Sequence, residues 1–317
     1  MSNPAGVSPR IPDLVLANPT AGGGLANEAL PLLEKFAAER HWQVNFRSAG
    51  SSSEFTQIAR EEACQGRTRI FALGGDGTFQ VLLNAVYGQP GVSVGVLPAG
   101  GGNDLASALG LPFHPVQAAK AILENGEARA VDAARVRTAD GIERLYMGGG
   151  GVGLDAEAAR FASGVYRRIR GRGRYLLSAI RALRGFQPLR LRVSFDGATQ
   201  RTIEATALVA GVLNTPSYGA GLRLAPGANL EDGMLDLAVL AHLNWTEILR
   251  ILPALAVTGE IHTRKIQRFL IRHVRIETDR PCMFHGDGEL IGQTPVEIMV
   301  VPAAIKVWRA GRNAWPV

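Results

Sequence analysis

The sequence predicts an α/β domain with a parallel sheet, followed by a domain built as an antiparallel β-sandwich. Three observations support this fold class. The chain has 317 residues, of which 46% are hydrophobic, so it is long enough for two domains and can bury a large core. Its first part alternates short apolar runs with segments of helical period. Its later part consists mainly of β-type runs separated by turn dipeptides.

The α/β domain is predicted over residues 1–132. Four apolar runs of strand length occur there, "DLVLA", "WQVNF", "RIFAL" and "VSVGVL". Between them lie segments with helical spacing, as in Leu30, Leu33, Phe36 and Ala37. This alternation is typical of βαβ units, which predicts a parallel sheet covered by helices.

The β-sandwich domain is predicted over residues 133–303. The strand-like runs are "LRLRVSFDG", "TIEATALVAGVLN", "MLDLAVL", "HVRIETD" and "VEIMVV", and "AIKVWRA" follows them near the end of the chain. Two stretches interrupt this pattern, the basic segment from Val165 to Arg184 and a predicted helix from Trp245 to about Thr258. The sequence shows no internal repeat and no long linker.

Composition limits the environment and the class of partner. Cys64 and Cys282 lie far apart and have no CxxC spacing, which favours a reducing compartment. The start "MSNPAGVSPRIPD" has no signal-peptide pattern, and no run reaches the ~18 apolar residues of a membrane span. We therefore expect a cytoplasmic protein. The net charge of +6 indicates an anionic partner, but charge alone does not choose between nucleotide, nucleic acid and membrane.

Three glycine-rich segments each follow a predicted strand. They are "NPTAGGG" at 18–24, "GGDGT" at 74–78 and "PAGGGND" at 98–104. Because the carboxyl ends of parallel strands share one edge of a sheet, the three loops should meet at the crevice where such folds bind ligands. Glycine lets backbone N–H groups approach phosphate oxygens, and the following helix N-terminus adds positive potential. The alternative is that each glycine only makes a tight turn.

The kind of nucleotide site can be narrowed by exclusion. A P-loop requires Gly-Lys-Ser/Thr, and none of the four lysines follows a glycine. The formal GxGxxG at Gly148, Gly150 and Gly153 lies in the β-rich half without a βαβ unit, so we interpret it as a turn near the active site. Asp76 lies among glycines. A carboxylate beside phosphate is repelled unless a divalent cation bridges them, so its natural role is to position Mg²⁺-ATP.

These motifs together resemble a known family. "GGDGTFQVLLNAV", "LPAGGGNDLASALG" and the late "DGE" at 287–289 are similar to the soluble bacterial diacylglycerol kinases and lipid kinases, relatives of eukaryotic diacylglycerol and sphingosine kinases. GGDGT alone is shared with NAD kinases, but the second loop and the late DGE favour the lipid branch. "GVGLDA" at 151–156 and "NLEDGMLDL" at 229–237 add to the resemblance.

The resemblance implies a kinase with ATP in the cleft between the two domains and a last segment, about 304–317, that returns to the first domain. The family usually has threonine where this chain has Gly101, and that hydroxyl contacts nucleotide, so backbone or water replaces it here or ATP binding is weakened. Carried over by motif, the nucleotide-binding residues are Asn18, Ser48, Gly74, Gly75, Asp76, Gly77, Thr78, Phe79, Gln80, Gly100, Gly101, Asn103 and Asp104.

A structural Mg²⁺ site is also implied by the resemblance. Its ligands would be Asp232 and the backbone carbonyls of Asn229 and Met234. Taken alone, the sequence of this segment favours an ordinary Asp-Gly turn before a strand.

The DGE segment is expected to supply the chemistry. In phosphoryl transfer a carboxylate accepts the proton of the attacking hydroxyl, and Asp287 or Glu289 is that acceptor, with the other orienting it or binding metal. The sequence does not rank the two. The alternative is a solvated hairpin turn within "HGDGEL". His285 is adjacent and could act as a base, but we interpret it as a partly exposed residue at a strand end.

The basic segment "VYRRIRGRGRYLLSAIRALRGF" predicts an arginine-rich loop that leads into an amphipathic helix. An anionic membrane surface is a natural target for it, and the alternative is a solvated face whose leucines pack on the sandwich. Nucleic acid is not expected, since no recognisable nucleic-acid fold occurs. The predicted membrane contacts are Arg167, Arg168, Arg170, Arg172 and Arg174.

The combined prediction is an ATP- and Mg²⁺-dependent lipid kinase in the cytoplasm. It would phosphorylate a hydroxyl of a lipid such as diacylglycerol at the membrane surface. One alternative is a small-molecule kinase of the NAD kinase type, which leaves the late DGE and the basic segment unexplained. Another is a regulator that binds nucleotide or lipid without catalysis. The lipid acceptor and the oligomeric state, a homodimer included, stay open.

Overall fold

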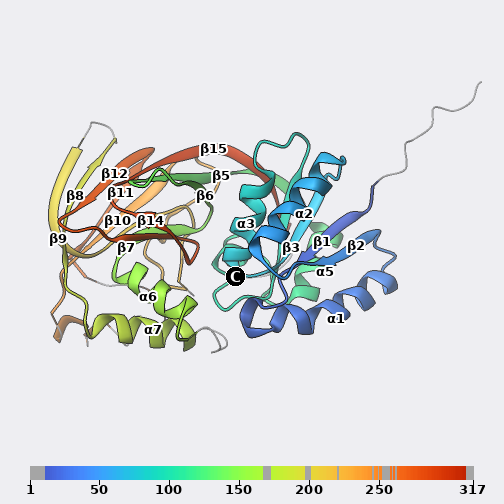
Figure 1. The fold of residues 1–317 in the computed structure, drawn as a ribbon, viewed down its shortest axis with the longest axis horizontal. Helices are drawn as coiled ribbons and strands as arrows, with labels where there is room; N and C mark the ends of the chain where they lie inside the picture. The colour runs from blue at the N-terminus through green and yellow to red at the C-terminus, as the bar shows by residue number, and fades with distance from the viewer. Residues whose placement is uncertain are drawn as a thin grey trace, which may run out of the picture.

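The computed structural model describes residues 11–166, 173–196, 201–219, 221–244, 246–248, 250–251, 258, 260 and 263–311. Figure 1 shows a helix-rich half and a strand-rich half side by side. Two long strands, β5 (Glu127–Thr138) and β15 (Val296–Arg309), run between the halves.

The helix-rich half contains a parallel sheet in the strand order β2-β1-β3-β4. This arrangement confirms the predicted α/β class for this part of the chain. Its elements are β1 (Asp13–Ala17), a 3-10 turn η1 (Ala21–Gly23), α1 (Leu25–Glu39), β2 (Val44–Ser48), α2 (Ser52–Cys64), β3 (Arg69–Gly74), α3 (Asp76–Val86), β4 (Ser93–Pro98), α4 (Asp104–Ala108) and α5 (Pro115–Asn125).

Helices cover both faces of this parallel sheet. Helix α1 contacts α5, and α2 contacts α3. Every residue of β1 and β4 is buried, as expected for strands packed on both sides. In α1 the predicted apolar stripe is the packed one, since Leu33, Phe36 and Ala37 are buried.

The strand-rich half is antiparallel, which confirms the second part of the predicted fold class. The strand order is β14-β13-β7-β9-β8-β12-β15, and β10 pairs with β9 and β11, while β6 pairs with β5. Its further elements are β6 (Glu143–Tyr146), β7 (Gly149–Gly153), α6 (Leu154–Ser163), α7 (Gly173–Leu183), β8 (Leu189–Phe195), β9 (Arg201–Leu213), β10 (Leu235–Ala241), β11 (Ile266–Ile271), β12 (His273–Thr278), β13 (Met283–Gly286) and β14 (Glu289–Gln293).

Strand β15 joins the two halves. It pairs antiparallel with β5 and β12, and its end pairs parallel with β4 through Lys306–Ser93 and Val307–Val94. Trp308 donates its indole N–H to the Ser93 hydroxyl at 3.0 Å. The described strands therefore form one continuous sheet, and the chain up to residue 311 ends against the first half. Residues 312–317 lie outside the described residues.

Three details of the strand-rich half differ from, or go beyond, the sequence predictions. The GxGxxG segment is not a turn, because residues 149–153 form strand β7, which pairs with β9 and β13. Helix α6 follows it directly and was not predicted. Within the predicted helix from Trp245 to Thr258, residues 246–248, 250–251 and 258 are helical, and the rest lies outside the described residues.

Candidate active site

The three glycine-rich loops meet at one edge of the parallel sheet, as predicted. The loops after β3 and β4 touch through their glycines, since a Cβ added to Gly75 would lie 3.0 Å from the Cα of Gly100. The loop after β1 joins them, because the Asn18 amide donates to the Thr78 hydroxyl at 3.2 Å. A side chain at the glycine contact would push two of the loops apart, so the glycines are needed for close packing.

Asn103 fixes the loop after β4. It has a left-handed backbone with φ 59°, and its side-chain oxygen accepts the Gly100 N–H at 2.9 Å. Its amide nitrogen donates to the Gly100 carbonyl at 3.1 Å. The side chain of Asn103 therefore shapes this loop from within.

Asp76 is the first residue of α3 and lies at the centre of the three loops. Its carboxylate accepts the backbone N–H groups of Asp104 at 3.3 Å and of Leu105 at 3.1 Å. Burial, and then the neighbouring Asp104 carboxylate, raise the pKa of Asp76 to about 7. The charge of Asp287 adds to the increase. Carboxylates concentrated in this way favour a bound cation.

Asp287 lies at the turn between β13 and β14. Asp287 and Gly288 both have positive φ, 50° and 85°, as a two-residue hairpin turn of type I′ requires. The predicted turn is therefore present, but the Asp287 carboxylate points inward and accepts three backbone N–H groups. The donors are Met147 at 2.9 Å, Gly148 at 2.8 Å and Gly149 at 3.1 Å. Burial outweighs these bonds and raises the pKa of Asp287 to about 6.

Glu289, on the same hairpin, lies against the loop after β3. A Cβ added to Gly77 would lie 2.7 Å from Oε1 of Glu289. Gln80 also donates its amide to the Gly286 carbonyl at 3.1 Å, so the GGDGT and DGE segments are in direct contact. The Glu289 side chain is exposed, yet partial desolvation raises its pKa, and the charge of Arg174 lowers it in part.

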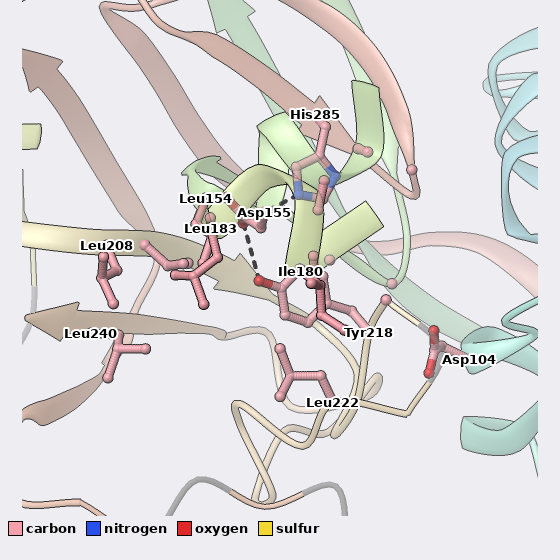
Figure 2. Close-up of a pocket in the computed structure, with 18 of the residues that line it drawn as sticks. Asp104, Leu154, Asp155, Ile180, Leu183, Leu208, Tyr218, Leu222, Leu240 and His285 are labelled. Carbon is pink, nitrogen blue, oxygen red and sulfur yellow. Dashed lines mark hydrogen bonds and ion pairs between the residues drawn. The ribbon is translucent and has the colours of Figure 1, made fainter. Parts of the chain in front are cut away.

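A cavity of about 500 Å³ begins at these carboxylates and extends into the strand-rich half, and we call it the chamber. Asp104 lies at one end of the chamber in Figure 2, and most of the remaining lining is aliphatic. Asp76 also lines the chamber and is hydrogen-bonded to the backbone of Asp104, and Asp287 lies near enough to Asp76 to raise its pKa. Such a volume suits a small-molecule ligand. The aliphatic lining includes Leu154, Ala158, Ala159, Ala179, Ile180, Leu183, Leu208, Val209, Leu222, Leu240, Leu243, Ile248 and Ile251.

A polar cluster lies between the carboxylate end and the aliphatic end of the chamber (Figure 2). The Tyr218 hydroxyl donates to Oδ2 of Asp155 at 3.0 Å, and Nε2 of His285 lies 3.2 Å from the same oxygen. The Tyr218 and His285 rings stack at 5.9 Å. Our interpretation of His285 as partly exposed was wrong, because it is only 4% exposed beneath α6, which contacts β13.

Asp155 and Tyr218 were not predicted as site residues. Asp155 lies within "GVGLDA", and the resemblance of this segment to the family was the signal that could have identified it. Tyr218 carries no local signal, since only the folded chain brings it to Asp155.

The other predicted nucleotide contacts lie at the same edge of the sheet but differ in how exposed their side chains are. Ser48 ends β2 beside Ala17 and is exposed, and Gly101 is half-buried. Phe79 is fully buried in the core, which leaves only its backbone available to a nucleotide. Gln80 is also buried and is engaged with Gly286.

The predicted structural metal site lies on the loop before β10. Asp232 accepts the Met234 N–H at 3.0 Å, and Asn229 accepts the Glu231 N–H at 3.1 Å through its side chain. Asp236 lies nearby, and burial followed by the charge of Asp232 raises its pKa to about 6. A cation at Asp232 would relieve this repulsion.

Within the described part of the chain, no three His, Cys, Asp or Glu side chains are placed to hold a metal by themselves. Mg²⁺ that arrives with ATP takes most of its ligands from phosphate and water and needs one or two carboxylates from the protein. The raised pKa of Asp76 fits that requirement, because a cation there would offset the neighbouring negative charge.

Four of the five predicted membrane contacts, Arg167, Arg168, Arg170 and Arg172, lie outside the described residues. Arg174 lies in the first turn of α7, close enough to Glu289 to affect its pKa. No helix among the described residues is both long and apolar enough to span a membrane.

Comparisons with known proteins decide the family. The family model for the diacylglycerol kinase catalytic domain matches residues 12–136. The model for the YegS C-terminal NAD kinase beta sandwich-like domain matches residues 148–309, more than half of the chain. The chain belongs to the diacylglycerol kinase and YegS-like lipid kinase family. Members of this family are phosphotransferases with an alcohol group as acceptor, so the chain is an enzyme of this kind.

Individual relatives agree with the family. The chain is 29% identical over 294 residues to a diacylglycerol kinase of Mycobacterium tuberculosis (strain H37Rv), covering 93% of this chain and 94% of the relative. It is 28% identical over 290 residues to a diacylglycerol kinase of Bacillus subtilis (strain 168), covering 90% and 92%. The crystal structure of a diacylglycerol kinase from Bacillus anthracis shares the fold, with a TM-score of 0.67 at 19% identity over 96% and 98% of the two chains.

Proposed function

We propose that the protein transfers the γ-phosphoryl group of Mg²⁺-ATP to a hydroxyl of a membrane lipid such as diacylglycerol, giving a phosphatidic-acid-type product. One observation supports this most strongly. The chamber presents a long aliphatic lining to its ligand and ends at Asp76, Asp104 and Asp287, beside the glycine-rich loops. A dinucleotide acceptor, as in an NAD kinase, would leave the aliphatic lining without a partner.

In this proposal the loops after β1, β3 and β4 hold the ATP phosphates through backbone N–H groups, with the N-terminus of α3 directed at them. Asp76 would bind the Mg²⁺ that accompanies ATP, directly or through water. Asp232 and the carbonyls of Asn229 and Met234 would hold a second, structural Mg²⁺. When bound, the ATP-associated ion neutralises charge on the transferred phosphoryl group.

We assign different roles to the two DGE carboxylates because they face different sides of the site. Asp287 lines the chamber, where the lipid hydroxyl would lie, so we assign it as the proton acceptor. Glu289 lies against Gly77 on the nucleotide side, where it would orient the loop or the metal. The hydroxyl proton passes to Asp287, the hydroxyl oxygen forms a bond to the γ-phosphorus, and the bond from that phosphorus to ADP breaks.

Filling the aliphatic part of the chamber tests whether it holds the lipid chain. Ala159 is buried in α6 and lines the chamber, so Ala159→Phe places a ring where an acyl chain would lie. With γ-labelled ATP and products identified by mass, we expect kcat/KM for long-chain diacylglycerol to fall about tenfold or more. Short-chain dioctanoylglycerol should be affected much less. The short-chain lipid is the internal control for folding, and an equal loss on both lipids would contradict this use of the chamber.

The basic segment gives a second testable expectation, which concerns the membrane. Leu177 and Ile180 of α7 are 43% and 42% exposed, and Val165 is 76% exposed, so apolar side chains accompany the arginines. Each arginine near an anionic surface contributes on the order of 1 kcal/mol, and salt screens this attraction. Replacing Arg167, Arg168, Arg170 and Arg172 by glutamine should release the protein from phosphatidylglycerol vesicles. The apparent KM for lipid should then rise in vesicles but change little in neutral micelles.

Cosedimentation with anionic and with neutral vesicles measures this binding. A matched control replaces the exposed arginines Arg190, Arg192, Arg201 and Arg280 of the strand-rich half. Equal release by the control variant, or no release by the test variant, would show that the basic segment does not specifically bind the membrane.

A further inference from the structure

A tight turn between β9 and β10 contacts both halves of the molecule. Tyr218 and Leu222 close it with two backbone hydrogen bonds, of 3.0 Å and 2.9 Å. Gly219 and Gly221 have positive φ, 61° and 101°, which lets the chain reverse. We call the segment from Ser217 to Leu222 the clasp turn, of which all residues except Ala220 are described.

One side of the clasp turn is held by Asp104 of the helix-rich half. Oδ1 of Asp104 accepts the Ser217 hydroxyl at 3.0 Å and the Gly221 N–H at 2.8 Å. Asp104 is 7% exposed, so these bonds join a buried carboxylate to its donors and are stronger than bonds between neutral groups. The backbone N–H of Asp104 donates to Asp76 at 3.3 Å. Asp104 therefore bonds both to Asp76 in the nucleotide-side loops and to the clasp turn.

The other side of the clasp turn forms part of the chamber wall. Tyr218, Gly219 and Leu222 line the chamber. The Tyr218 hydroxyl donates to Asp155, and this hydrogen bond connects the clasp turn to the polar cluster (Figure 2). Three hydrogen bonds thus link Asp76 to Asp104, Asp104 to Ser217 and Tyr218 to Asp155, and the peptide bond between Ser217 and Tyr218 completes the series.

We propose that the clasp turn couples the nucleotide site to the lipid chamber. Ser217 is the positioning residue that holds the nucleotide site and the chamber in a fixed relative position. Any shift of the loop after β4 on nucleotide binding would move Asp104, and Asp104 would carry Tyr218 with it. Nucleotide and lipid would then favour the same arrangement of the clasp turn. Each ligand would bind more tightly when the other is present. The inference rests on the proposed function, since it takes the chamber as the lipid site and the glycine loops as the nucleotide site.

The test measures this coupling with the full chain. The affinity for a non-hydrolysable ATP analogue is measured with empty detergent micelles and with micelles that contain dioctanoylglycerol. For the wild type we expect the lipid to tighten nucleotide binding by a factor in the usual allosteric range of about 5 to 150. In Ser217→Ala the factor should fall toward 1, and kcat/KM for the lipid should fall about tenfold. Ser217→Thr, which retains a hydroxyl, should restore most of both.

Two further variants separate coupling from a general structural effect. Ser194→Ala removes a hydroxyl from the exposed β8–β9 pair, where it bonds Thr202 at 3.1 Å, and should retain wild-type coupling. Tyr218→Phe removes the bond to Asp155 at the far end of the series and should lower the coupling factor as Ser217→Ala does. The double variant Ser217→Ala/Tyr218→Phe should lose little more than either single variant, because the two changes break one series.

A wild-type factor of 1, or a Ser217→Ala variant with the wild-type factor, would overturn the proposal. Fully additive losses in the double variant would also contradict it. Failure of the wild type to bind nucleotide or to phosphorylate any lipid would count against the proposed function instead.

Discussion

Asp76→Asn should lower kcat by about 10² or more, a typical effect of losing one electrostatic contact in a transition state. Asparagine has nearly the shape of aspartate and retains an acceptor for one of the two N–H donors, Asp104 and Leu105. It lacks the charge that would bind the Mg²⁺ of ATP. The measurement is the rate of lipid phosphorylation at saturating lipid over a range of Mg²⁺ and ATP concentrations. The variant should require more of both.

Two controls accompany this variant. Asp279→Asn removes an exposed carboxylate at the end of β12 and should retain full activity. Thermal unfolding of Asp76→Asn should stay close to that of the wild type, because ionised Asp76 is unfavourable in the folded chain. Near-normal activity in Asp76→Asn would rule out its role at the metal.

The raised pKa of Asp76 predicts how the activity of the wild type depends on pH. Its value of about 7, and that of Asp287 at about 6, are both above the ordinary value for aspartate. Both groups must be ionised to bind a cation or accept a proton. Activity should therefore fall as the pH decreases through about 7 and 6. The profile of kcat/KM reports the free enzyme and is the appropriate measurement. A flat profile from pH 5 to 8 would contradict these roles.

The positions of Asp76 and Asp287 were predictable because local patterns encode them. The buried strands β1, β3 and β4 are short apolar runs, each followed by glycines, and parallel strands bring those glycines to one edge. The DGE segment is a two-residue hairpin turn that Asp287 and Gly288 encode locally. That the Asp287 carboxylate points inward, to Met147 and its neighbours, depends on pairing far along the chain.

The chamber and its polar cluster were not predictable, because they too depend on pairing between segments far apart along the chain. Leu154, Tyr218 and Leu240 are far apart in sequence and become neighbours only when β7, β9 and β10 pair. Strand β7 was itself interpreted as a turn, since glycine has low strand propensity. Its hydrogen bonds to β9 and β13 on either side override that propensity. His285 was interpreted as partly exposed because helix α6, which contacts β13, was not predicted.

Asp287→Asn and Glu289→Gln should separate the two DGE carboxylates. Asp287→Asn removes the proton acceptor at the chamber, so kcat should fall roughly 10²-fold or more with little change in ATP affinity. The raised pKa of Asp287, about 6, lies close enough to neutral pH for efficient proton transfer. Glu289→Gln acts on the nucleotide side, against Gly77, so part of its loss should appear in the KM for ATP.

Steady-state kinetics with ATP and lipid varied independently distinguish these outcomes. Glu204→Gln alters an exposed glutamate of β9 that lies 3.9 Å from Arg192, and it should behave as the wild type. The pH dependence adds a second readout, because the activity that remains in Asp287→Asn should lose the part of the profile near pH 6. If neither DGE variant lowers kcat, the hairpin is only a turn. If only Glu289→Gln lowers it, with ATP affinity unchanged, then Glu289 is the proton acceptor and our assignment of Asp287 is wrong.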